Sequence, residues 1–176
     1  MAQSFLSALG KDYDISPWLI PVDSQGGANT GFRISMQNCR GIGIWIIKNT
    51  GTTTDYLVPI VSEHTAYTGG TTAALAVVTK FWTRSEASLD GDEAWVANTQ
   101  AASGTVTWNS LLQSQIYFEI MADQLSDGYT HISVSAADTG SAGAMLMAGA
   151  YIQFGLKTQR IPSNLPNPLN PGTANA

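Results

Sequence analysis

The run Gly41–Lys48, G-I-G-I-W-I-I-K, constrains the fold of this chain more than any other stretch. Side chains alternate between the two faces of a strand, so Ile42, Ile44 and Ile46 share one face. The other face carries Gly41, Gly43, Trp45 and Ile47. A strand that is apolar on both sides has to be covered on both. We expect a second sheet over one face, and either a further layer of this chain or another subunit over the other.

Short strands, separated by turns rich in Gly, Asn, Asp and Thr, are predicted along the rest of the chain. Gln115–Met121 alternates most cleanly, with Ile116, Phe118 and Ile120 expected inside. Thr130–Ala137 repeats the pattern, with Ile132, Val134 and Ala136 expected inside and His131, Ser133 and Ser135 outside. The other predicted strands are Ile15–Val22, Phe32–Met36, Tyr56–Ser62, Val77–Arg84, Ala94–Ala97, Thr105–Trp108 and Ala144–Phe154.

Prolines place two of these strands. Pro17 and Pro21 cannot donate to a sheet ladder, so Ile15–Val22 is expected at a sheet edge, and Pro59 predicts that Tyr56–Ser62 is an edge or bulged strand. Nine or ten short strands without a long helix predict an all-β fold, an antiparallel β-sandwich. A jelly-roll-like strand order is compatible with this pattern.

The chain ends differ from the predicted β-sandwich domain, residues 15–155. Residues 1–14 are expected to form an N-terminal arm or a short helix, because Phe5, Leu6 and Leu9 recur at helical spacing. Residues 156–176 hold four of the seven prolines, in the run I-P-S-N-L-P-N-P-L-N-P. Such a run favours an extended, polyproline-like C-terminal arm.

Composition excludes several functional classes. The net charge is −5 with 8 Lys plus Arg and no basic cluster, which argues against nucleic-acid binding. Charged residues make up only 12% against 44% hydrophobic, as in proteins that function inside assemblies. The weakly polar run 142–152 is shorter than the roughly 20 residues of a membrane helix. The N-terminus lacks a signal-peptide pattern and the single Cys39 excludes an intrachain disulfide, so we expect synthesis in a cytoplasm with Cys39 as a small buried hydrophobe.

Possible chemical motifs have simpler structural interpretations. Asp138-Thr139-Gly140-Ser141 matches an aspartic-protease motif, but one copy would require a symmetric dimer to supply the second carboxylate, and a hairpin turn is the simpler interpretation. Asp90, Asp92 and Glu93 could gather around calcium, yet their spacing is that of a solvated acidic turn.

Neither the histidines nor the tryptophans define an active site. His64 and His131 are the only histidines and form no zinc motif. The five tryptophans are Trp18, Trp45, Trp82, Trp95 and Trp108. They are more simply core or interface anchors than sugar platforms. We therefore expect no enzyme activity, no cofactor and no metal.

Three regions between residues 20 and 155 contain short recognisable segments: P-V-D at 21–23, G-A-N-T-G at 27–31, R-I-S-M-Q-N at 33–38, E-I-M-A-D-Q-L at 119–125, D-G-Y at 127–129 and A-D-T-G at 137–140. Together these segments resemble a family of small head-associated proteins of tailed bacteriophages. The chain departs from the family pattern in residues 82–108 and in its tail. The resemblance implies a structural role on the capsid, as a decoration or cement protein, and places the D-T-G in a turn.

This combination leads to the expectation of a structural virion protein that decorates and stabilises a tailed-phage capsid. We expect a homotrimer that binds the major capsid protein on the outer capsid surface, without nucleic acid or membrane. The candidate partner-binding residues are Phe5, Trp18, Trp45, Ile47, Ile161, Pro162, Leu165, Pro166 and Leu169. The alternatives are a tail or adhesin-type carbohydrate-binding module and, more remotely, a dimeric aspartic protease acting through Asp138.

Overall fold

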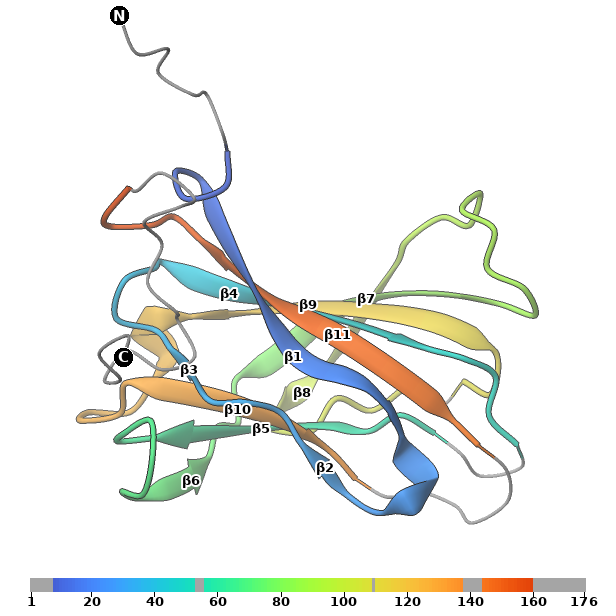
Figure 1. Cartoon of the computed structure of the whole chain (residues 1–176), viewed down its shortest axis with the longest axis horizontal. Helices are drawn as coiled ribbons and strands as arrows, with labels where there is room; N and C mark the ends of the chain where they lie inside the picture. The colour runs from blue at the N-terminus through green and yellow to red at the C-terminus, as the bar shows by residue number, and fades with distance from the viewer. Residues whose placement is uncertain (1–7, 53–55, 109, 138–143, 160–176) are drawn as a thin grey trace, which may run out of the picture.

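Two antiparallel β-sheets, packed face to face, form the protein (Figure 1). The structure is a computed structural model that describes residues 8–52, 56–108, 110–137 and 144–159. The larger sheet has the order β1-β11-β4-β9-β7-β8. Its strands are β1 (Tyr13–Asp23), β4 (Gly41–Lys48), β7 (Val78–Glu86), β8 (Val96–Ser103), β9 (Gln113–Met121) and β11 (Leu146–Phe154).

The smaller sheet has the order β2-β10-β5-β6, and β3 also pairs with β10. Its strands are β2 (Asn29–Thr30), β3 (Ile34–Ser35), β5 (Pro59–His64), β6 (Thr72–Ala74) and β10 (His131–Ala136). Two short 3₁₀ helices, η1 (Ser24–Gly26) and η2 (Ala122–Gln124), follow β1 and β9. The all-β antiparallel sandwich predicted from the sequence is confirmed.

The core lies between the sheets and is built from the expected faces of the central strands. Ile42, Ile44 and Ile46 of β4 are fully buried, as are Ile116, Phe118 and Ile120 of the neighbouring β9. Ile132, Val134 and Ala136 of β10 meet them from the other sheet. β4 is a central strand between β11 and β9, and the smaller sheet covers its inner face, as its apolar sequence requires.

Two aromatic side chains fasten the sheets to each other by hydrogen bonds. Trp18 Nε1 donates to the Val134 carbonyl at 2.7 Å, and the Val134 amide donates to the Tyr151 hydroxyl at 3.0 Å. Both rings are fully buried. Trp18, expected to bind a partner, therefore has no surface to offer one and serves as a core anchor.

The prolines act at strand positions that tolerate them. β1 is an edge strand, as Pro17 and Pro21 predict. The prediction for Pro59 is wrong, because β5 lies inside the small sheet, between β10 and β6. Pro59 is the first residue of β5, a position where the missing N–H costs the ladder nothing.

Other differences have local causes. The strand predicted at Thr105–Trp108 does not form; the chain there makes single hydrogen bonds beside β5, such as Val106 N to the Pro59 carbonyl at 2.9 Å. β8 extends to Ser103 through a mostly exposed polar run that lacks the alternation of a half-buried strand. The described part of the predicted arm or helix at 1–14 is a turn at 8–12 followed directly by β1.

Candidate functional site

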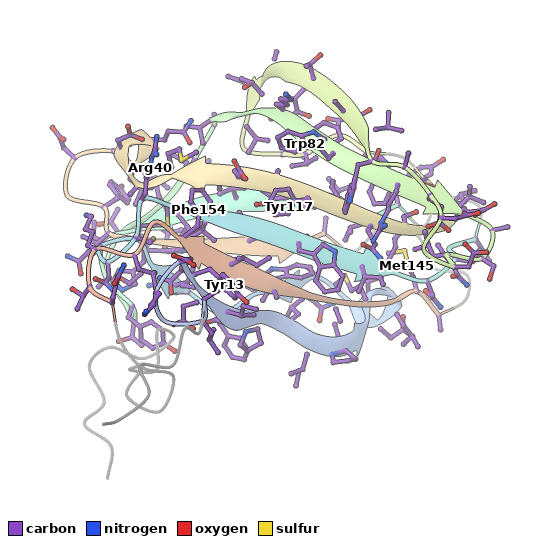
Figure 2. The ribbon with its side chains drawn as sticks, turned by 90° about the horizontal axis from the view of Figure 1, so that it is seen from above. Tyr13, Arg40, Trp82, Tyr117, Met145 and Phe154 are labelled. Atoms are coloured by element: carbon purple, nitrogen blue, oxygen red, sulfur yellow. The ribbon has the colours of Figure 1, made fainter. Side chains whose placement is uncertain are left out.

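Among the described residues, the outer face of the larger sheet is the strongest candidate for a functional surface. Figure 2 looks onto this face, where Tyr13, Phe154, Tyr117 and Trp82 follow one another across the sheet. The strand register divides it into two regions. We call these the apolar half, on β1, β11 and β4, and the aromatic cleft, on β9, β7 and the residue before β8.

Apart from Asp23, which pairs with Leu146 at the end of β1, the apolar half carries no charged side chain. Its members are Tyr13, Ile15, Pro17, Trp45, Ile47, Leu146, Ala148, Ala150, Ile152 and Phe154. They share this face because their neighbours in each strand, such as Ile44 and Tyr151, point into the core. Ile15 and Leu146 are 53% and 52% exposed. Trp45 and Ile47, the expected partner-binding residues of β4, are half-buried here.

Four residues line the aromatic cleft, an open hollow of about 470 Å³: Trp82, Trp95, Tyr117 and Glu119. The rings of Trp82 and Tyr117 are 6.0 Å apart between centroids and tilted by 46°, so they contact each other and form one wall of the hollow. A Cβ at Gly43 would collide with the Tyr117 ring. Glycine at that position of β4 therefore gives the ring its place on the sheet.

Polar groups at the cleft are held in fixed positions. The Tyr117 hydroxyl donates to Glu119 Oε1 at 2.8 Å. Burial, and then the hydrogen bond to Glu119, raises the pKa of Tyr117, so the hydroxyl remains a donor at neutral pH. Lys80 Nζ lies 4.8 Å from the centre of the Trp82 ring, and the Arg84 guanidinium lies 4.8 Å from that of Trp95. The ring faces of this region thus already attract cations.

A single amide links the cleft to the apolar half. Gln115 Oε1 accepts hydrogen bonds from Arg84 Nε at 3.1 Å and Nη2 at 2.8 Å, and from Trp45 Nε1 at 3.1 Å. Trp45 and the Arg84–Trp95 pair are therefore oriented by one acceptor. From the sequence, Trp82 and Trp95 could be recognised only as two of the five tryptophans. A turn lies between the two strands that carry or adjoin them, and this arrangement could have predicted that they lie close together.

Several expected partner-binding residues lie outside the described residues. These are Phe5, Ile161, Pro162, Leu165, Pro166 and Leu169. The Asp138-Thr139-Gly140-Ser141 motif lies outside them as well.

A buried Ser–His pair, which the sequence did not reveal, lies on the outer face of the smaller sheet. His64 Nε2 shares a hydrogen bond with Ser133 Oγ at 2.8 Å, and His64 Nδ1 shares one with Thr72 Oγ1 at 2.9 Å. Burial, followed by the charge of Arg33, lowers the pKa of His64 to about 4. The pair resembles a nucleophile and its base, but Ser133 is 3% and His64 4% exposed, and the third member is a hydroxyl rather than a carboxylate. It is a structural network.

The burial of this polar pair corrects the expectation that His131 and Ser133 face solvent. The loop between β5 and β6 folds over them, with the Tyr67 ring centroid 6.2 Å from that of His131. Gly69 and Gly70, both at positive φ, turn this loop, and Arg33 holds it through the Ala66 and Gly69 carbonyls at 2.9 and 2.7 Å.

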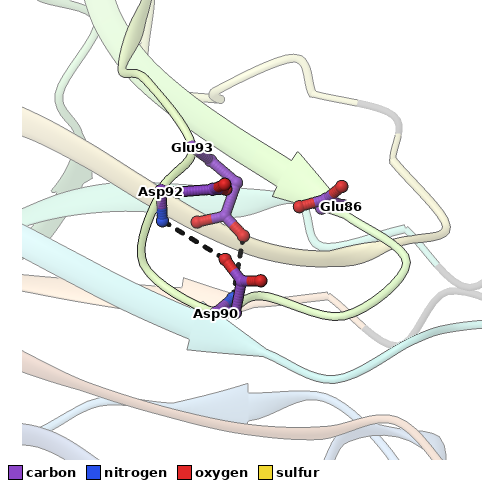
Figure 3. Close-up of side chains that lie close together, drawn as sticks. All are labelled: Glu86, Asp90, Asp92 and Glu93. Atoms are coloured by element: carbon purple, nitrogen blue, oxygen red, sulfur yellow. Dashed lines mark hydrogen bonds between the residues drawn. The ribbon is translucent and has the colours of Figure 1, made fainter.

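The acidic turn gathers four carboxylates, Glu86, Asp90, Asp92 and Glu93, with oxygens within 4.8 Å of one another (Figure 3). Glu93 accepts from the amides of Asp90 at 2.9 Å and Gly91 at 3.3 Å, and Asp90 Oδ1 accepts from the Asp92 amide at 3.3 Å. A hydrogen bond with Glu93 raises the pKa of Glu86, while backbone amides, that of Asp90 first, lower the pKa of Glu93. These contacts close the turn between β7 and β8, and Glu86 joins the three residues expected from the sequence.

A second hollow, of about 480 Å³, lies at the other end of β4, beside Cys39, Arg40, Met121, Asp123 and Lys157. Cys39 itself is fully buried, and burial raises the pKa of its thiol to about 11. It packs as the small hydrophobe that the sequence predicted, without the thiolate character of a reactive cysteine.

Comparisons with protein-family models, curated proteins and solved structures find no match to this chain. Among the described residues, no helix has the length and apolar character needed to cross a bilayer.

Proposed function

We propose that this chain is a structural virion protein that decorates the outer surface of a tailed-phage capsid and stabilises it without catalysis. The observation that carries the proposal is the apolar half, a three-strand face that includes exposed Ile15 and Leu146 and whose one charged residue, Asp23, lies at its margin. A continuous exposed apolar face of this kind is typical of a protein–protein interface. The family resemblance in residues 20–155 supplies the virion context.

In this proposal the mechanism is mechanical. Copies of the chain associate as a homotrimer, and the oligomer contacts neighbouring major-capsid subunits. Burial of apolar surface contributes about 25 cal/mol per Å² before the costs of association are subtracted. Several modest contacts on one oligomer act together, because each bound copy holds the others near their sites. The terminal segments, with Phe5 and with Ile161 to Leu169, would extend that reach.

The test replaces an apolar outer-face residue with a charge. Ile47→Asp places a carboxylate on the β4 side of the apolar half, and Thr68→Asp adds the same charge to an exposed loop of the small sheet. We expect the wild type and Thr68→Asp to sediment as oligomers and to remain on expanded heads during washing. Ile47→Asp should sediment as a monomer and be lost from the heads. Equal assembly and retention of the two variants would refute the proposal.

A further inference from the structure

The aromatic cleft is the part of the outer face that lies outside the apolar half, the interface of the proposed function. Trp82, Trp95 and Tyr117 offer ring surface, and Glu119 adds a carboxylate whose hydrogen-bond donor, among the described residues, is the Tyr117 hydroxyl. Rings tilted by 46° do not make the flat platform on which a pyranose stacks. They fit a narrow apolar ridge, and the carboxylate favours a positive charge beside that ridge.

This chain contains a segment with both properties. Residues 160–171 read R-I-P-S-N-L-P-N-P-L-N-P, with one arginine, four prolines and no acidic residue. Proline-rich segments in the polyproline conformation present their rings as ridges, and aromatic-lined grooves are their usual receptors. The Arg160 guanidinium is the charge complement of Glu119.

The register places the cleft within reach of this segment. Phe154 pairs with Gly41, Gly41 with Met121, and the cleft residue Trp82 with Tyr117. Three strand spacings across the sheet and four residues along β9 put Trp82 about 20 Å from Phe154. The chain is held as far as Lys157, whose amide donates to the Asn38 carbonyl at 2.9 Å. A polyproline-like segment from Arg160 to Pro171 would span about 37 Å, at ~3.1 Å per residue.

We propose that the aromatic cleft binds the proline-rich C-terminal segment, residues 160–171. The proline rings pack against the open sides of the Trp82 and Tyr117 rings that line the hollow, and the Arg160 guanidinium pairs with the Glu119 carboxylate. Within one chain, attachment supplies the segment at an effective concentration in the millimolar range, which compensates for a small contact area. Between neighbouring copies, the same contact would tie one subunit to the next.

Cysteine cross-linking of the full-length chain tests the contact. Glu119→Cys combined with Arg160→Cys should form a disulfide under mild oxidation at least ten times faster than the control pair Thr68→Cys with Arg160→Cys. The native Cys39 does not interfere, because its thiol is buried. An intrachain product places the segment on its own cleft, and a covalent dimer places it on a neighbour's; either outcome supports the contact.

The background Trp82→Leu supplies the second arm. It should lower the cross-linking rate toward that of the control pair while the circular dichroism of the sandwich is unchanged. Equal rates for the two cysteine pairs would overturn the proposal. Equal rates together with quenching of tryptophan fluorescence by cellohexaose would reassign the cleft to carbohydrate. Loss of capsid retention in Ile47→Asp is a separate readout, so the two proposals can fail independently.

Discussion

The outer faces of the two sheets differ in polarity and in exposure. The larger sheet leaves an apolar face exposed, with Ile15 at 53% and Leu146 at 52%. The smaller sheet buries a polar one, where His64 and Ser133 are 4% and 3% exposed beneath the β5–β6 loop. Both ring nitrogens of His64 are hydrogen-bonded within the chain, although the neighbouring His131 Nε2 is buried without a partner among the described residues. The exposed apolar groups of the larger sheet stabilise nothing until something covers them. The polar face of the smaller sheet is covered within the monomer, whereas the apolar face of the larger sheet is the one that the proposed assembly would cover.

Acidification should have the largest effect, because it should destabilise the folded state through the buried polar face of the smaller sheet. Burial holds the pKa of His64 at about 4, below its ordinary value of 6.5, so the folded state resists protonation that the unfolded state accepts. The stabilisation by neutral His64 is complete above pH 6.5 and is lost as the pH falls toward 4. Urea unfolding from pH 7 to pH 4.5 should therefore show a falling midpoint in the wild type. His64→Gln should show a shallower fall, and parallel curves would contradict this account.

Removal of the Ser133 hydroxyl from the buried face of the smaller sheet should lower the unfolding free energy by a smaller amount. Ser133→Ala leaves a buried nitrogen of His64 without its hydroxyl partner, which should cost about 1–3 kcal/mol of unfolding free energy. Ser135→Ala on the same strand is the matched control, because Ser135 Oγ lies 3.4 Å from the Ile60 carbonyl and its loss should matter less. Equal losses in denaturant titrations would show that the His64 network is not the stabilising feature.

A substitution on the exposed apolar face should change the unfolding free energy least. Ile15→Ser on edge strand β1 removes apolar surface that the monomer leaves open, so its unfolding free energy should change by no more than about 0.5 kcal/mol. The measurement is urea unfolding at a concentration where the chain is monomeric. A loss above 2 kcal/mol would mean that Ile15 is covered within the monomer, and the contrast between the two faces would no longer hold.

Most of the strands could be predicted from local pattern. The bounds of β4 agree residue for residue, and β9, β10 and β11 lie within two residues of prediction, because half-buried strands alternate in sequence. β8 was predicted too short, since an exposed polar edge strand has no apolar alternation to detect. Trp18, a candidate partner-binding residue by sequence, lies in the core, because sequence alone does not tell a core tryptophan from an interface one.

Some features of the candidate site could likewise be predicted from the sequence, and others could not. The sequence determined that β4 would be apolar on both faces, and it singled out Trp45 and Ile47, because period-two alternation is a local property. Only the tertiary structure decided which face the small sheet covers, which tryptophans meet in a cleft and which histidine is buried. These contacts join residues far apart in the chain, such as Trp82 with Tyr117 and His64 with Ser133, and they depend on strand order and register. No local pattern encodes them, because they form only when non-neighbouring segments pack together.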